Sequence, residues 1–93
     1  MRFYGLCKNR HPMPVNDFVF EEAGNIFEFN RLEETAYNKL KEAEGEAAIY
    51  VTGLSMLLVA VLKAAQRLNM SLDLYHFNNE TEGYEVQRWD PQN

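Results

Sequence analysis

The second half of the chain alternates between strand-like and helix-like segments, and this alternation limits the possible folds more than any other feature. Residues 47–51 (Ala-Ala-Ile-Tyr-Val) form a short apolar run that is typical of a buried parallel strand. Residues 54–69 have the apolar spacing of a long helix, and residues 71–77 alternate as a strand does. A strand, a helix and a strand in this order predict a parallel pair joined by a right-handed crossover.

The first half of the chain contributes further strands and one helix. Strands are predicted at residues 2–7 and 26–29, while residues 17–20 fit either a short strand or a helical turn. Asn30 and Glu33 form a capping-box-like pair, which predicts a helix over residues 31–44. One face of this helix holds Leu32, Ala36, Leu40 and Ala43, and the opposite face is charged.

The end of the chain completes the predicted fold. Residues 84–88 alternate like residues 71–77, so the two segments close an antiparallel hairpin. We predict a single α/β domain over residues 1–93, a small Rossmann-like domain with a mostly parallel sheet and a C-terminal antiparallel hairpin. This domain would have three layers, or only one face of its sheet would be well covered. A split βαβ sandwich of ferredoxin type is the alternative.

Composition and charge exclude several classes of protein. The net charge is -5, from nine basic and fourteen acidic residues, which argues against coating of bulk nucleic acid. The single cysteine, Cys7, excludes an internal disulfide and fits a reducing, cytoplasmic location. His11 and His76 supply too few ligands for a metal centre, and we expect no cofactor. The sequence has no recognisable signal peptide, and its longest apolar stretch is far below the ~20 residues that a membrane span needs.

The turn after residues 47–51 is the first candidate for a ligand site. Thr52 and Gly53 lead into the long helix, which Leu54 and Ser55 open. Open α/β sheets bind ligands beyond the carboxyl ends of their strands, and a helix N-terminus there offers free N–H groups to a phosphate. Gly53 would let the ligand approach the backbone, and the hydroxyls of Thr52 and Ser55 would add hydrogen bonds. The structural alternative is that Thr52 caps the helix and Gly53 relieves the turn.

The second candidate follows the first predicted strand. Lys8, Asn9, Arg10 and His11 belong to the basic start of the chain, because residues 1–16 contain no acidic residue. Arg10 would bind a phosphate through its planar guanidinium group, and Lys8 would act as a point charge. Asn9 would contact a sugar or base. His11 could move a proton or donate a hydrogen bond, because histidine is the side chain that changes charge near neutral pH. The alternative is a solvated loop.

The two candidates converge if the first and third strands are neighbours in a parallel sheet. Both turns then open at the same edge, so that the basic segment faces Thr52 and Gly53. His76, near the end of the fourth predicted strand, would border the same crevice, although it also fits an ordinary edge-strand histidine. The predicted ligand-binding residues are therefore Lys8, Asn9, Thr52, Gly53, Leu54, Ser55 and His76.

The long helix has more apolar surface than one buried face requires. Besides its core stripe, Met56, Val59 and Ala60 form a second apolar strip. A chain this short buries only roughly 60–65% of its unfolded surface, which favours self-association. We expect a homodimer, with this strip at the subunit contact or under the first helix.

Two short motifs resemble a known family. Residues 49–53 (Ile-Tyr-Val-Thr-Gly) and the helix after them resemble the CRISPR-associated Rossmann-fold ligand domains, which use such a turn to hold a cyclic oligonucleotide. Asn9, Arg10 and His11 resemble the Arg-His loop of small CRISPR-associated proteins grouped with ring nucleases. The chain departs from the larger domains at Leu54, where a second glycine often stands. Its compact form is also typical of phage and prophage proteins that bind or disarm host defence signals.

The resemblance implies a symmetric homodimer with the ligand across its two-fold axis. It also implies cleavage without metal, in which a ribose 2′-hydroxyl attacks its own phosphate. Arg10 and His11 would then be the catalytic residues, Arg10 by stabilising the charge of the phosphorane and His11 as general acid or base.

These observations lead to one functional expectation and one rival. We expect a protein that binds a phosphorylated ligand, a cyclic oligonucleotide second messenger, and either cleaves or sequesters it. The rival is a phage- or mobile-element-encoded inhibitor that docks on a host defence protein. Its basis is the acidic segment of residues 17–46, where nine acidic residues against three basic ones could mimic nucleic acid.

Overall fold

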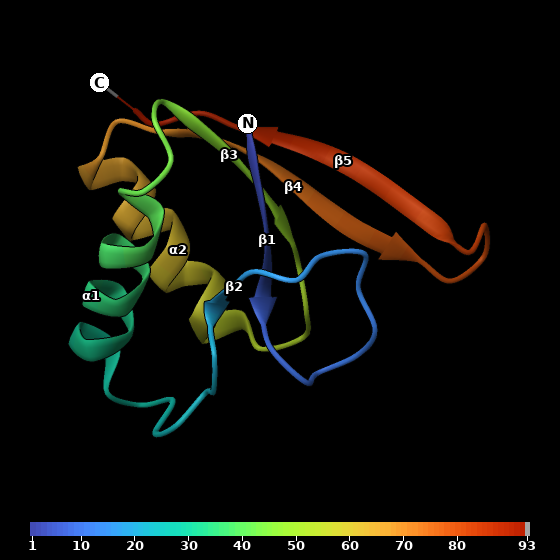
Figure 1. Ribbon diagram of the computed structural model, residues 1–93, viewed down its shortest axis with the longest axis horizontal. Helices are drawn as coiled ribbons and strands as arrows, with labels where there is room; N and C mark the ends of the chain where they lie inside the picture. The colour runs from blue at the N-terminus through green and yellow to red at the C-terminus, as the bar shows by residue number, and fades with distance from the viewer. Residues whose placement is uncertain (93) are drawn as a thin grey trace.

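The computed structural model describes residues 1–92, which form a five-stranded sheet and two helices (Figure 1). The elements are β1 (Arg2–Cys7), β2 (Phe18–Phe20), α1 (Phe29–Leu40), β3 (Glu46–Tyr50), α2 (Ser55–Arg67), β4 (Ser71–Asn78) and β5 (Gly83–Trp89). The strand order is β2-β1-β3-β4-β5; the first four are parallel, and β5 is antiparallel to β4. The predicted α/β class, with its mostly parallel sheet and C-terminal hairpin, is confirmed.

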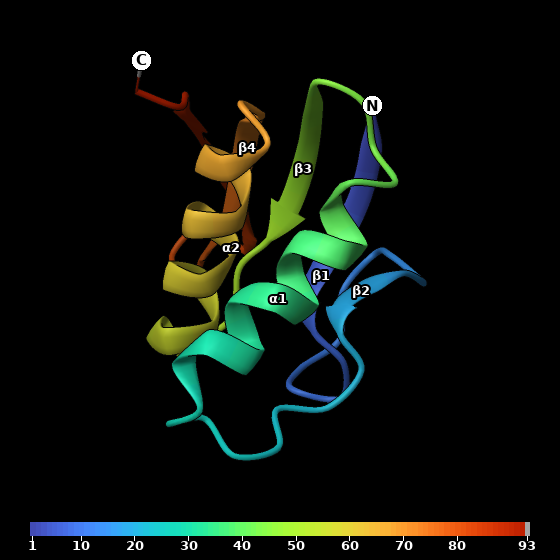
Figure 2. The ribbon, with the colours of Figure 1, turned by 90° about the vertical axis from the view of Figure 1, so that its left-hand side faces the viewer.

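Both helices cover the same face of the sheet (Figures 1 and 2). The chain moves in one direction across the sheet from β2 to β3 and from β3 to β4, so right-handed crossovers place α1 and α2 on one side. The step from β1 to β2 runs the other way, and residues 8–17, which make it, contain no helix. The fold therefore has two layers. The prediction of three layers is wrong, and the prediction of only one well-covered face is confirmed. The four parallel strands exclude the ferredoxin-type sandwich that was the alternative.

The core lies between the helices and the covered face. Leu6 of β1, Ile49 of β3 and Leu72 of β4 are fully buried there. The predicted face of the first helix, Leu32, Ala36, Leu40 and Ala43, is buried as expected. The second helix buries Leu57, Ala60, Val61, Ala64 and Ala65. Within residues 1–92, neither helix has the length and apolar character needed to cross a membrane.

The strand predicted at residues 26–29 is wrong, because this segment is the turn that begins α1. The side chain of Asn25 accepts a hydrogen bond from the Phe27 N–H at 3.0 Å, and the Arg31 guanidinium donates to the Asn25 carbonyl at 2.9 Å. Phe27 and Phe29 are 68% and 59% exposed. Two aromatic side chains that would suit a buried strand therefore lie at the surface, beside the first turn of the helix.

The first helix also begins and ends before its predicted limits. It starts at Phe29 with no side-chain cap, so the expected capping box at residue 30 does not form. It ends at Leu40, because the Ala43 N–H donates to the Leu40 carbonyl in a tight turn. Gly45 then adopts φ +80°, a left-handed conformation that suits glycine.

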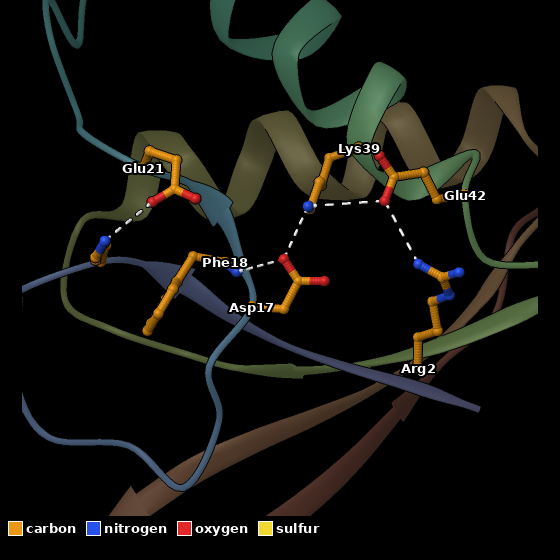
Figure 3. Close-up of polar contacts among 7 residues, drawn as sticks. Arg2, Asp17, Phe18, Glu21, Lys39 and Glu42 are labelled. Carbon is orange, nitrogen blue, oxygen red and sulfur yellow. Dashed lines mark hydrogen bonds and ion pairs between the residues drawn. The ribbon is translucent and has the colours of Figure 1, made fainter.

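The connection of residues 8–17 lies against part of the uncovered face, where His11 and Pro12 line one cavity with Phe77 and Tyr84. A Cβ atom on Gly5 would lie 2.6 Å from the Phe18 ring and 2.8 Å from the sulfur of Met13. Glycine at this buried position therefore permits a close approach of β2 and the connection. On the helix side, the ion pair of Lys39 with Asp17 joins α1 to the residue that precedes β2 (Figure 3).

Candidate functional site

The connections after β1, β3 and β4 meet at one edge of the sheet. Gly5 is the register partner of Tyr50, and Tyr50 is the partner of Tyr75, so the three strands end side by side. A cavity of about 700 Å³ opens there, which we call the edge cavity. It is lined by His11, Pro12, Val51, Thr52, Gly53, His76, Phe77, Asn79 and Tyr84. The structure thus brings together four of the residues selected from the sequence, from three separate segments of the chain.

Thr52 occupies an unusual position in this cavity. Its side chain is only 7% exposed, and its hydroxyl has no hydrogen-bond partner within residues 1–92. It does not cap α2, whose N-cap residue is Leu54 and whose first turn has no side-chain cap. The capping alternative is therefore wrong, and the Thr52 hydroxyl is a buried polar group without a partner in the described residues.

The first turn of α2 leaves backbone donors free. The N–H groups of Leu57 and Leu58 are the first to bond within the helix, both to the carbonyl of Leu54. The N–H groups of Ser55 and Met56 precede them and have no intrahelical acceptor, as at any helix start. Since the positive end of the helix dipole lies at the same point, this turn favours an anion.

Gly53 is open to solvent rather than needed for backbone geometry. No heavy atom lies within 4 Å of the place where a Cβ would stand, and its φ is not in the left-handed region. The idea that glycine relieves strain in this turn therefore finds no support. The open space is compatible with a ligand that approaches the backbone closely.

The residues of the basic segment, 8–11, do not all line the edge cavity. His11 lines the cavity, while Asn9 and Arg10 line a shallow hollow beside it that shares His11 and Pro12. Lys8 lines neither of them, and its ammonium lies 3.6 Å from a carboxylate oxygen of Glu21. Arg10 is thus placed at the rim of the cavity.

The remaining predicted residues are distributed unevenly. His76 lines the edge cavity and its Nε2 lies 2.9 Å from Oε1 of Gln87. Leu54 packs against the core, and Ser55 is exposed in the first turn of α2; neither side chain lines the cavity.

An aromatic wall was missed by the sequence analysis. Phe77 and Tyr84 both line the edge cavity, and their ring centroids are 5.4 Å apart at an interplanar angle of 71°. They are register partners in the β4–β5 hairpin. The alternation of both segments could have identified them, once the register of the hairpin was known.

Cys7 does not have the properties of a nucleophile. It is 1% exposed, and burial raises the pKa of its thiol, although the nearby charge of Arg10 opposes this effect. A raised pKa leaves little thiolate at neutral pH. Within residues 1–92, no group of three or more His, Cys, Asp or Glu side chains is arranged to hold a metal ion.

The second apolar strip of α2 is divided between the core and the surface. Ala60 is buried, Met56 is half-buried and Val59 is 50% exposed. With Phe29 they line an apolar groove of about 270 Å³ between the two helices, which we call the helix groove. Glu33 and Lys63 bring charge to its rim.

Comparisons with known proteins do not add to this geometry. No protein-family model matches the chain, and neither the curated proteins nor the solved structures gave a significant match.

Proposed function

We propose that the protein binds a small phosphorylated ligand, a cyclic oligonucleotide second messenger, in the edge cavity. The observation that carries this proposal is the unpartnered hydroxyl of Thr52, more than nine-tenths buried beside the start of α2. An unsatisfied buried polar group costs about 1–3 kcal/mol. A phosphate oxygen that accepts from Thr52 and from the free N–H groups of Ser55 and Met56 would offset this cost.

The other walls of the cavity suit the rest of a nucleotide. Phe77 and Tyr84 offer aromatic surface on which a base can stack. Arg10 at the rim and His11 in the wall add a cation and a hydrogen-bond donor. The volume of about 700 Å³ is in the range of small-molecule sites.

Cleavage of the ligand would need no metal. A ribose 2′-oxygen bonds to the adjacent phosphorus while the 5′-oxygen leaves, which yields a 2′,3′-cyclic phosphate and a 5′-hydroxyl. His11 takes the proton of the 2′-hydroxyl or supplies one to the leaving oxygen, water completes the other proton transfer, and Arg10 stabilises the charge of the phosphorane. If the ligand is not cleaved, the protein acts by binding and sequestering it.

The resemblance to CRISPR-associated domains supplies the biological setting of the proposal. We place the protein in the cytoplasm, where Cys7 stays reduced, and in antiviral defence. A phage or prophage origin fits a protein that removes a host signal by binding or cleaving it.

Thermal unfolding with a panel of cyclic oligoadenylates tests this function. A ligand at 100 times its Kd stabilises the native state by ~2.7 kcal/mol, which shifts the midpoint by several degrees. Thr52→Val keeps the shape and removes the unpartnered hydroxyl, so it should hold or raise the stability of the free protein and abolish most of the ligand shift. Thr35→Val, on α1, is the matched control and should keep the shift. No shift with any ring in the wild type would contradict the proposal.

The rival function, docking on a host defence protein, draws on the helix groove and the exposed Phe27. Mimicry of nucleic acid has less support. Seven of the nine acidic residues in the acidic segment form ion pairs within the chain: Asp17, Glu21, Glu28, Glu33, Glu34, Glu42 and Glu46. Binding of a host protein by a chain that gives no shift with any nucleotide would favour this rival.

A further inference from the structure

The last strand, β5, forms one edge of the sheet. It pairs with β4 at each of its seven residues, without a bulge. The opposite edge is β2, which has only three residues. Natural proteins protect an edge from other chains with short strands, prolines, lysines or bulges. The long and regular β5 contains neither proline nor lysine, so this edge lacks the usual protection.

The hydrogen-bond pattern of β4 shows which backbone groups it offers to β5. The Val51 N–H donates to the Tyr75 carbonyl at 2.9 Å, so Tyr75 directs its backbone groups toward β3. Successive residues of a strand alternate in this direction. Leu74 and His76 therefore direct their N–H and C=O groups toward β5.

The same alternation identifies the outward backbone groups of β5. The partners of Leu74 and His76 are Gln87 and Glu85, which direct their groups back to β4. The N–H and C=O groups of Tyr84, Val86 and Arg88 therefore lie on the outer side of the strand. Among residues 1–92, no backbone group of another segment bonds to them. A further strand added at this edge would satisfy them.

The outward groups of β5 match those of a second β5. In an antiparallel pair centred on Val86, the valines of the two copies lie opposite each other, and Tyr84 lies opposite the Arg88 of the second copy. All three residues direct their backbone groups outward, so every outward N–H meets an outward C=O. This register therefore leaves no outward group of these residues without a partner.

The side chains are complementary in the same register. On one face the two valines form an apolar pair, and each Arg88 lies opposite a Tyr84 ring, an arrangement that permits a cation–π contact. On the other face Glu85 lies opposite Gln87, whose amide can donate to the carboxylate. A pair centred on Glu85 would instead place two carboxylates opposite each other, which is unfavourable. Charge thus favours a second copy in the register centred on Val86.

We propose that two copies of this chain associate through β5 about a two-fold axis at Val86, so that their sheets become one continuous sheet. The turn end of the β4–β5 hairpin lies away from both helices (Figure 1), which leaves this edge accessible. The net charge of -5 on each copy opposes association, so the dimer should be reversible and should strengthen with salt, which screens the repulsion.

This contact differs from the one expected from the sequence, which used the apolar strip of α2. The ring of Tyr84 also lines the edge cavity, but the proposed hydrogen bonds use its backbone. The dimer is therefore independent of any ligand in the cavity.

Opposite charges at Val86 provide a specific test. Val86→Lys and Val86→Glu each place two like charges opposite each other at the axis, and either should weaken the dimer by roughly tenfold. Mixing the two variants places a lysine opposite a glutamate and should restore association. Val59→Lys, in the helix groove, is the matched control, since Val59 is 50% exposed and Val86 55%. Sedimentation equilibrium of the full chain over micromolar concentrations measures all of these.

The other outcomes contradict the proposal. A wild-type chain that is monomeric at all concentrations has no such interface, and its β5 edge is open to a different partner. A dimer weakened by Val59→Lys but by neither Val86 variant belongs to the helix groove. If the mixture associates no better than each variant alone, the two valines do not meet at an axis. Thermal unfolding shows whether each variant is folded.

Amide hydrogen exchange of the wild-type chain tests the contact without any substitution. The N–H groups of Tyr84, Val86 and Arg88 should exchange severalfold more slowly as the protein concentration rises and the dimer forms. Those of Glu85 and Gln87 already bond to β4, so they should change much less and serve as internal controls. Unchanged exchange of the three outward amides in a dimeric sample would place the contact elsewhere.

Discussion

The ammonium of Lys39 lies 2.8 Å from a carboxylate oxygen of Asp17, so an ion pair joins the last turn of α1 to the residue that precedes β2 (Figure 3). The same carboxylate accepts a hydrogen bond from the Phe18 N–H at 3.1 Å. β2 has only three residues and lies at the edge of the sheet. The ion pair therefore contributes to holding this short strand against the helical layer.

Removal of this pair should lower stability modestly. Lys39→Met should reduce the free energy of unfolding by about 0.5–1 kcal/mol, since the ammonium is 26% exposed and the carboxylate 43% exposed. Asp17→Asn should have a similar effect, and the double variant should lose less than the sum of the two. Urea unfolding measures all three. Lys41→Met, at an exposed neighbouring position, is the control, and an equal loss there would contradict a specific role of the pair.

Stability should fall at alkaline pH. Burial and the neighbouring Tyr75 and Tyr84 raise the pKa of Tyr50, and the hydrogen bond to Asp17 raises the pKa of Lys39. Both groups keep their protons longer in the folded chain, so their contribution is complete below the unfolded pKa of about 10 and is lost as the pH rises through the higher folded values.

Urea unfolding at several pH values between about 8 and 11 measures this loss. Tyr50→Phe and Lys39→Met should each reduce the pH dependence in the alkaline range. An unchanged slope in both variants would show that other groups cause it.

A methyl group at Gly5 should disturb the packing of β2. Its Cβ would lie 2.6 Å from the Phe18 ring, so Gly5→Ala forces the ring and Met13 to move and should cost about 1–3 kcal/mol. Gly53→Ala is a matched control, because no atom lies within 4 Å of its Cβ position. Thermal unfolding compares the two variants, and equal stabilities would show that the packing around Gly5 adapts without cost.

Cys7 should react slowly with thiol reagents in the native protein. It is 1% exposed and burial raises its pKa, so thiolate is scarce and access requires local opening. The rate at neutral pH should be roughly a hundredfold or more below that of the chain unfolded in urea. Absorbance of the released chromophore measures both rates, and similar values would place the thiol at the surface.

Cleavage, if the ligand turns over, should depend on His11 and not on a metal. His11→Ala should lower the single-turnover rate by roughly 10²–10⁴ if His11 is the general acid or base. A smaller loss that appears mainly in binding would make it a ligand contact. Arg10→Ala should weaken binding by ~1.5–3 kcal/mol. Activity that a chelator abolishes and a divalent ion restores would contradict the mechanism.

Local sequence patterns were sufficient for the strand–turn–helix unit of the site. The apolar run before Thr52 and the helical spacing after Gly53 fix where β3 ends and α2 begins, and the parallel order then brings His11 to the same edge. Each of these inferences uses residues close in sequence together with a topological rule.

The errors arise where distant residues decide the outcome. Lys8 pairs with Glu21, which follows β2. The exposed Phe27 is an exception, because Asn25 and Arg31 hold its turn locally. The aromatic wall depends on the hairpin register, which the turn sets with Glu82 at φ +57°. Neither an ion pair across strands nor a residue with positive φ has a reliable signal in a single sequence.

The ten-residue connection between β1 and β2 determines two properties of the molecule at once. A helical crossover in its place would convert the sheet into a doubly wound fold and shield the stacked rings of Tyr50 and Tyr75 on the uncovered face. The same replacement would remove His11 and Pro12 from the wall of the cavity. The solvent-open rings and the accessible cavity therefore share one origin, the omission of a single helix. A homologous chain that gained a helix at this point would be expected to lose both surfaces together.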